Sequence, residues 1–332
     1  MTGFGRRFFQ KGLALRANEL SHRVSFLSLL SCIRISTRMN ALLAPVAEAP
    51  SGCEPVLEAQ GHAQQRRGCV STLKAHWPEY LMELAELGLF MISACVVTAI
   101  LEHPASPARQ LLQSDFLRRA LTGLAMGLTL VLLIHTGWGK RSGAHMNPAI
   151  TLMFLRLRKV QACDGVFYIL CQFVGALAGV TLVFLAFGRI LAHPNVNFAV
   201  TQPGVRGVIV AFAAELVISF LLATTVLIAS NDKKLSRFTP YLAASLVALY
   251  IAYEAPFSGM SMNPARTLGS ALPAHVFQAI WIYFTAPPLA MLIAGETYLR
   301  VRSARNVFCA KLHHDNQARC IFRCRYRELH GS

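Results

Sequence analysis

Charged residues are scarce in this sequence. Asp, Glu, Lys and Arg make up only 14% of its 332 residues, whereas 54% are hydrophobic. Soluble globular proteins carry about 25% charged residues, so the composition excludes an ordinary soluble domain and favours a lipid bilayer. The sequence also lacks a nucleophile and a base at a spacing typical of catalysis, which argues against an enzyme.

Acidic residues are the rarer charged kind, 16 against 32 Lys and Arg, and the net charge is +16. The basic residues lie in the tails and in alternate loops, which argues against nucleic acid as a partner. Lys and Arg are enriched in cytoplasmic loops, so we expect both termini in the cytoplasm. The segments assigned to that side hold Lys140, Arg141, Arg156, Arg158, Lys159, Lys233, Lys234, Arg237, Arg300, Arg302 and Arg305, against Arg109, Arg118, Arg119, Arg189 and Arg206 outside.

Long apolar runs fill most of the chain after residue 80. A helix needs about 20 apolar residues to cross the hydrocarbon core. Two apolar segments, 147–156 and 263–272, are too short to cross and too apolar for solvated loops, so we predict re-entrant half-helices that line a cavity inside the protein. Six segments read as spans: 81–101, 118–136, 164–187, 207–229, 239–254 and 275–297.

Each short segment begins with the same three residues, Asn147-Pro148-Ala149 in the first and Asn263-Pro264-Ala265 in the second. Proline fits the first turn of a helix and asparagine caps it, so each motif predicts a helix start. At membrane depth the two N-termini would direct partial positive charge and amide donors at whatever lies between them. A single copy would be a weak signal, but two copies between long apolar spans indicate a channel.

The two halves of the chain repeat one another. Ala85-Glu86-Leu87 precedes the first motif and Ala214-Glu215-Leu216 the second, and each half holds three spans and one half-helix. An odd number of spans gives the two copies opposite orientations. With these motifs, residues 80–299 resemble the aquaporin, or major intrinsic protein, family. The resemblance implies an all-α integral membrane protein with six transmembrane helices, two re-entrant half-helices and an inverted 3+3 repeat, whose copies cover residues 80–200 and 201–299.

Carboxylates inside a bilayer are costly, so those within the spans are structural or functional by default. The resemblance implies that Glu86 and Glu215 accept hydrogen bonds from the backbone of the re-entrant loops. A role in proton relay is the alternative for both. Glu83 and Glu254 lie nearer to span ends, and for these two we expect solvation at the membrane interface.

The resemblance also implies how the channel wall is built. Asn147 and Asn263 would donate side-chain amides to a single file of water, while the helix ends and Arg266 disfavour protons and cations. We expect the His145 side chain to pack the loop and not to gate the channel. Backbone carbonyls would come from Gly143, Ala144, His145, Gly259, Met260 and Ser261.

Selectivity is where the sequence departs from a strict water channel of this family. Relative to the family pattern, the arginine is kept while the aromatic residue and the histidine are lost, which predicts a wider, less polar constriction. Thr267, where glycerol facilitators carry aspartate, and the pair Tyr283-Phe284 favour water. Aligned residue by residue, the constriction falls on Met126, Ile251, Met260 and Arg266.

These features predict a passive channel for water, with room for small neutral solutes, in the inner or plasma membrane. The resemblance implies a homotetramer, and we expect no cofactor for conduction. The alternative is a facilitator mainly for glycerol, urea, ammonia or metalloid acids. A structural membrane protein that conducts poorly is a further rival, which the intact motifs and Arg266 disfavour.

Both ends of the chain lie outside the resemblance. We expect little packed structure in residues 1–79; residues 1–47 hold one acid, Glu19, which is typical of a transit peptide or an upstream extension. No disulfide framework is visible among the nine cysteines. The basic cytoplasmic tail, residues 300–332, either meets anionic lipid headgroups or binds one zinc ion. The candidate zinc ligands are Cys309, His313, His314, Cys320 and Cys324.

Overall fold

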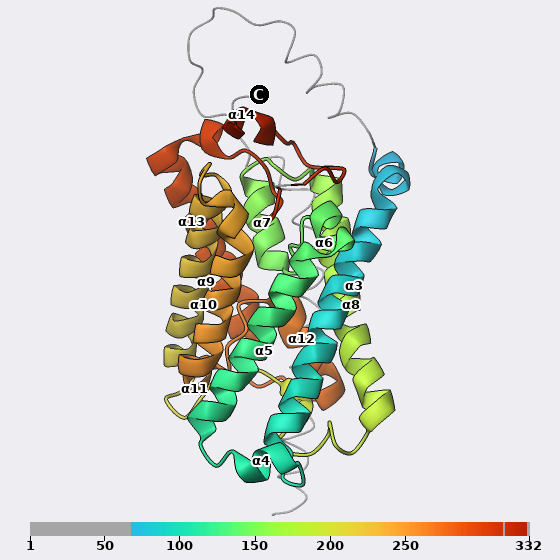
Figure 1. Ribbon diagram of the computed structural model, residues 1–332, viewed down its shortest axis with the longest axis vertical. Helices are drawn as coiled ribbons and strands as arrows, with labels where there is room; N and C mark the ends of the chain where they lie inside the picture. The colour runs from blue at the N-terminus through green and yellow to red at the C-terminus, as the bar shows by residue number, and fades with distance from the viewer. Residues whose placement is uncertain (1–67, 315, 331–332) are drawn as a thin grey trace, which may run out of the picture. The chain divides into compact units, whose positions relative to one another are not determined.

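The structure is a computed structural model that describes residues 68–314 and 316–330, and every regular element within those residues is helical (Figure 1). Six long helices are α3 (Cys69–Glu102), α5 (Asp115–His135), α8 (Ala162–Phe187), α9 (Val208–Ser230), α10 (Thr239–Tyr253) and α13 (Trp281–Arg302). Two short helices, α7 (Pro148–Arg156) and α12 (Pro264–Ala274), begin at the repeated motifs. The remaining elements are α4 (Pro107–Leu111), α6 (Gly137–Ser142), α11 (Ala255–Ser258), α14 (Tyr326–His330) and the 3-10 turns Asn197–Ala199, Ser236–Phe238 and Ala304–Asn306.

Each predicted span corresponds to one long helix, which confirms the expected all-α membrane fold. Four of them, α3, α5, α8 and α9, are long and apolar enough to cross a membrane by length and composition alone. Helix α10 has 15 residues, which gives it a length of about 22 Å, and α11 follows it directly. Helix α13 has 22 residues and is less uniformly apolar, because it contains Pro287, Pro288 and Glu296.

The first long helix starts earlier than predicted. Helix α3 begins at Cys69, so the expectation of little packed structure before Tyr80 is wrong for residues 69–79; residues 1–67 lie outside the described part of the chain. A disulfide from Cys69 to Cys163, which the sequence did not reveal, ties the start of α3 to the start of α8. Buried Asp164 also accepts hydrogen bonds from His76 Nδ1 (2.7 Å) and Tyr80 Oη (2.6 Å). These contacts hold the early turns of α3 against α8.

Glycines allow α3 and α8 to pack very closely. A Cβ atom added at Gly179 would lie 2.3 Å from the Gly88 carbonyl oxygen, and one at Gly175 would lie 2.1 Å from the Leu84 carbonyl oxygen. In the second half, α9 and α13 meet through Ala211 and Ala286, both 0% exposed. The long helices of the first half are therefore in tighter backbone contact than those of the second.

The two short helices enter the bundle from opposite ends and point their N-termini at each other (Figure 1). Helix α7 packs against α13 of the second half, and α12 packs against α8 of the first half. Each half-helix is thus held by a long helix of the other half. This interleaving is the inverted repeat that the sequence predicted.

Residues after α13 fold back over one end of the bundle, called the tail end below. Arg319 donates from Nη2 to the carbonyl oxygen of Ala75 (3.2 Å) and lies 3.7 Å from the Glu79 carboxylate. The tail end is therefore also the end at which α3 begins. The opposite end, where α4 and α11 lie, is called the far end.

Candidate functional site

The repeated motifs form the N-termini of the two half-helices, as their sequence predicts. The Asn147 side-chain oxygen accepts from the Ala149 amide (2.8 Å), and the Asn263 oxygen accepts from the amides of Ala265 (3.0 Å) and Arg266 (3.2 Å). Each cap satisfies amides that have no partner inside the helix. The positive ends of both helix dipoles consequently meet in the middle of the bundle.

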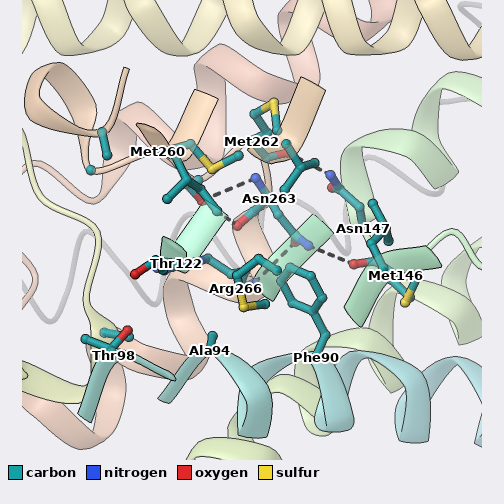
Figure 2. Close-up of a pocket in the computed structure, with 18 of the residues that line it drawn as sticks. Phe90, Ala94, Thr98, Thr122, Met146, Asn147, Met260, Met262, Asn263 and Arg266 are labelled. Atoms are coloured by element: carbon teal, nitrogen blue, oxygen red, sulfur yellow. Dashed lines mark hydrogen bonds between the residues drawn. The ribbon is translucent and has the colours of Figure 1, made fainter. Parts of the chain in front are cut away.

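The two asparagines are held reciprocally by the opposite half (Figure 2). Asn147 Nδ2 donates to the Met262 carbonyl oxygen and Asn263 Nδ2 donates to the Met146 carbonyl oxygen, both at 2.7 Å. A side-chain amide carries two N–H groups. Each asparagine therefore keeps a second N–H for another acceptor.

The loops before the motifs share an unusual backbone. Gly143, Ala144 and Met146 have φ values of 95°, 54° and 47°, and the matching residues of the second loop, Gly259, Met260 and Met262, have 78°, 50° and 54°. Residues other than glycine rarely adopt this left-handed backbone conformation. The four that are not glycine are therefore strained, and contacts around the loops must offset the energy of that strain. The two loops repeat one another in conformation as well as in sequence.

Buried carboxylates hold the first loop. Glu83 accepts from the amides of His145 and Met146, both at 2.7 Å, and from Gln172 Nε2 at 2.9 Å. Glu86 accepts the Ser142 hydroxyl at 3.0 Å. The sequence assigned the backbone bonds to Glu86, and the structure corrects this to Glu83, three residues earlier on the same face of α3.

A single carboxylate holds the second loop. Glu215 accepts from the amides of Ser261 (2.7 Å) and Met262 (2.8 Å) and from the Ser258 hydroxyl (2.8 Å). Interface solvation was predicted for Glu83 and Glu254, and the structure contradicts both, because Glu83 is 0% and Glu254 9% exposed. Glu254 lies at the junction of α10 and α11, where the turn between them buries it.

A cavity of about 440 Å³ runs along the two loops. All four residues predicted for the constriction, Met126, Ile251, Met260 and Arg266, line it. One guanidinium nitrogen of Arg266, Nη1, has no protein hydrogen-bond partner among the described residues. The wall thus combines three apolar side chains with one arginine that can still donate.

Sequence reasoning missed several lining residues on the long helices. They occur at helical spacing, three or four residues apart, so each set occupies one face of its helix. This periodicity could have indicated which helix faces line the cavity. A stripe that faces lipid or another helix has the same period, however, so the period alone does not identify the lining. The missed positions include Leu87, Phe90, Ala94, Thr98, Thr122, Leu130, Ala243 and Val247.

The carbonyl segments follow the prediction except at one position. Ala144, His145, Gly259, Met260 and Ser261 belong to residues that line the cavity. Gly143 does not, because its carbonyl oxygen accepts the amide of Leu312 from the tail (3.1 Å).

The residues used to infer water selectivity lie behind the cavity wall. Thr267 is 1% exposed, and its hydroxyl contacts those of Ser261 (2.5 Å) and Thr201 (3.0 Å). Tyr283 donates its hydroxyl to the Ser258 carbonyl oxygen (2.5 Å), and Phe284 stacks on Phe173. These residues can influence the solute only through the position of the second loop.

Four of the five predicted metal ligands come together in the tail. The ligand atoms of Cys309, His314, Cys320 and Cys324 all lie within 4.8 Å of one another. His313 is not part of the group, since its ring packs against that of His135 at 4.8 Å. Nearby, burial lowers the pKa of Lys311 and of Lys159.

Residues 71–298 match the family model of the major intrinsic protein. The chain belongs to the major intrinsic protein family. It is therefore a passive membrane channel of the aquaporin kind and not an enzyme. The chain is 34% identical to Aquaporin NIP6-1 of Arabidopsis thaliana over 215 residues, which are 64% of this chain and 66% of that protein. It is 31% identical to Aquaporin NIP2-2 of Zea mays over 219 residues, 65% of this chain and 72% of that protein.

One further relative known by sequence and one solved structure are also similar to this chain. Aquaporin-4 of Notomys alexis is 32% identical over 184 residues, 54% of each chain. The X-ray structure of the aquaglyceroporin from Plasmodium falciparum superposes with a TM-score of 0.58 at 17% identity, and the match covers 70% of this chain and 98% of that one. At this identity the structural likeness establishes the shared fold. The chain spans between 54% and 72% of the length of these three relatives known by sequence.

Proposed function

We propose that this major intrinsic protein is a water channel whose constriction also admits small neutral solutes. The observation that carries the proposal is the facing pair Asn147 and Asn263. Each has one N–H bonded across the repeat and a second one free to donate to a water oxygen in the cavity. Carbonyls on one wall and apolar side chains on the other give a passing molecule a few weak partners, enough to replace hydration without trapping it.

The composition of the constriction supports passage of more than water. Met126, Ile251 and Met260 offer no hydrogen bond strong enough to favour water over a larger polar solute, and only Arg266 donates. Glycerol, urea, ammonia or a metalloid acid as the main solute is the alternative. The Plasmodium falciparum neighbour is described as an aquaglyceroporin, and the two residues that favour water, Thr267 and Tyr283, lie behind the wall.

We also propose where and how the channel resides. The basic loops favour placement of the tail end in the cytoplasm of an inner or plasma membrane. Large apolar side chains exposed on the bundle, such as Leu182, Leu185, Ile209 and Val217, suit contact with lipid or with neighbouring copies in a homotetramer. Conduction needs no cofactor, and we assign the tail cluster to zinc.

Stopped-flow shrinkage of proteoliposomes tests the proposal. Purified protein is reconstituted, and osmotic steps are imposed with sucrose, glycerol and urea in parallel. We expect a water permeability well above that of empty vesicles, reflection coefficients of one for sucrose, and values below one for glycerol or urea. Replacement Asn263→Leu removes the donor and should lower water permeability, whereas Asn195→Leu at the far mouth of the cavity serves as a matched control. A glycerol rate that exceeds the water rate would favour the facilitator instead.

A further inference from the structure

Residues 307–314 and 316–326 lie across the tail end of the bundle, and almost none of them are helical. They are hydrogen-bonded to two of the connections between long helices, the one from α5 to α8 and the one from α9 to α10. These bonds run from Leu312 N to Gly143 O (3.1 Å), from Arg323 N to Lys159 O (3.0 Å), from Phe308 N to Asn231 Oδ1 (2.7 Å) and from Tyr326 Oη to Ser236 Oγ (3.1 Å). The tail is thus a folded cap and not a solvated extension.

Part of this cap contacts the channel at the tail end. Leu312 belongs to the lining of the cavity at the tail end, beside Ala144 and His145. The Phe322 ring stacks on the His145 ring with centroids 5.3 Å apart and 9° between planes, and His145 Nε2 contacts the Ala310 carbonyl oxygen at 2.8 Å. We call Ala310, Lys311, Leu312 and Phe322 the tail plug; each is 6% exposed or less.

Lys311 adds a charge to the plug. Its ammonium group donates to the carbonyl oxygens of Lys140 (2.6 Å), Ala318 (3.2 Å) and Arg319 (2.8 Å). Three acceptors offset much of the cost of burying the ammonium group. Through these bonds Lys311 joins the part of the tail around residue 311 to residues 318–319 and to α6, which lies beside the first loop.

The four cluster residues bracket the plug in the sequence. Cys309 and His314 flank residues 310–312, and Cys320 and Cys324 flank Phe322. Bonds that join all four residues would hold residues 310–312 and Phe322 in place together. Because the segment has almost no helix of its own, its order depends on such side-chain links and on docking.

The geometry of the cluster suits one tetrahedral zinc ion. Zn–S bonds of about 2.3 Å and Zn–N bonds of about 2.0 Å place neighbouring ligand atoms about 3.5 to 3.8 Å apart. Cys309 Sγ and Cys320 Sγ, 3.6 Å apart, match this spacing. Cys324 Sγ and His314 Nε2, 3.0 Å apart, are closer than it and would separate by about 0.5 Å to hold the ion. Three thiolates and one imidazole form a closed structural site with no open position, so the ion would hold the fold and perform no chemistry.

We infer that zinc binding by Cys309, His314, Cys320 and Cys324 locks the tail plug in place and closes the channel at the tail end, and that loss of the metal releases it. The inference rests on the proposed channel function. Binding converts thiols to thiolates and releases protons, with no change of oxidation state. A ligand that binds only the docked tail multiplies the docked-to-released ratio, by about a hundredfold at a free concentration 100 times its dissociation constant.

Metal stoichiometry and tail protection test the site without measuring transport. Full-length protein is purified anaerobically without a thiol reductant, so that the Cys69–Cys163 disulfide stays intact, and zinc is counted by elemental analysis. We expect one equivalent in the parent and none in Cys320→Ser. Zinc should protect the tail from trypsin at Arg319 and Arg323 in the parent, and it should give no protection in Cys320→Ser. Cys171→Ser, a half-buried cysteine on α8 outside the cluster, is the matched control and should behave as the parent.

Transport tests the closure. Vesicles are equilibrated with buffered zinc or with a permeant chelator on both sides, and water permeability is compared. We expect zinc to lower it at least tenfold in the parent and Cys171→Ser, and not at all in Cys320→Ser. Leu312→Ala keeps every ligand, so it should still bind one zinc while conducting more than the zinc-loaded parent.

The outcomes separate the inference from the channel function. A parent that binds no zinc, or one that binds one equivalent and conducts equally with zinc and with chelator, overturns the inference. If chelated protein, Cys320→Ser and Leu312→Ala all fail to conduct, the proposed function fails. In that case zinc-dependent protection from trypsin still decides whether the metal holds the tail, and its absence overturns that part as well.

Discussion

The two re-entrant loops have the same backbone but are supported differently. In the first loop Glu83 takes the backbone amides and Glu86 takes the serine hydroxyl, whereas in the second Glu215 does both. The first loop is also covered by the tail, and the second carries Arg266 where the first carries Ile150. The two halves therefore share the backbone geometry of their loops. They differ in the carboxylates that hold each loop, in whether the tail covers it and in whether an arginine follows its motif.

Removing one carboxylate from each half tests this division most strongly. Glu215→Ala leaves two amides and one hydroxyl without their acceptor, at about 1–3 kcal/mol for each unsatisfied buried group, so we expect a loss of at least about 3 kcal/mol. Glu86→Ala affects one hydroxyl and should cost about 1–3 kcal/mol. Thermal unfolding in detergent, followed by intrinsic fluorescence, compares the two variants. Equal costs would mean that Glu86 and Glu215 are equivalent after all.

Helix packing is the second difference between the halves. Gly179→Ala places a methyl group within 2.3 Å of the Gly88 carbonyl oxygen, and we expect a destabilisation of about 1–3 kcal/mol from overpacking. Gly165→Ala on the same helix meets nothing nearer than 3.6 Å and should leave the melting temperature unchanged or slightly raised. A harmless Gly179→Ala would show that α3 and α8 need no glycine contact.

The charge after the second motif gives a selectivity prediction. Arg266→Ala removes a fixed charge and the donors of the guanidinium group from the cavity wall. We expect urea or glycerol permeability to rise about tenfold relative to water, equivalent to about 1.4 kcal/mol of barrier. The matched variant Ile150→Ala lies at the corresponding place in the first half and should change that ratio much less. Stopped-flow measurements on both variants in parallel provide the comparison, and equal shifts would contradict the role given to Arg266.

The smallest expected effect concerns Ile251. Twelve residues before its asparagine the first half carries His135, which does not line the cavity, whereas the second half carries Ile251, which does. Ile251→His narrows the wall and adds a polar ring, so glycerol or urea permeability should fall about threefold relative to water, less than 1 kcal/mol of barrier. Ile251→Leu keeps the apolar wall and should not change the ratio. A parent with reflection coefficients of one for all these solutes would contradict the wide constriction.

Much of this architecture could be read from local sequence. The six spans and the half-helix starts at Asn147 and Asn263 are set by apolar length and by capping chemistry, which are local. The assignment of Arg266 to the constriction came from the family resemblance instead. The choice between Glu83 and Glu86 was not local. Both lie on one face of α3, and only the position of the first loop in space decides which of them reaches the amides.

The tail was the hardest part to predict. Leu312 lines the cavity and Phe322 stacks on His145 through contacts with residues more than 150 positions earlier in the chain. No periodic sequence pattern indicates such contacts. The metal-binding cluster was easier to predict, because Cys309, Cys320 and Cys324 are typical zinc ligands and lie close together in the sequence. Sequence spacing could not choose between His313 and His314, because adjacent residues differ in direction only once the backbone is placed.

The reciprocal bonds between Asn147 and Met262 and between Asn263 and Met146 have a consequence for synthesis. A ribosome completes the first half long before Met262 emerges, so the first asparagine waits without its acceptor until the second half has entered the membrane. Neither half can form these two hydrogen bonds alone. Once one of the bonds has formed, the donor and acceptor of the second bond lie close to each other. The bonds at the middle of the bundle can therefore form only after both half-helices have entered the membrane.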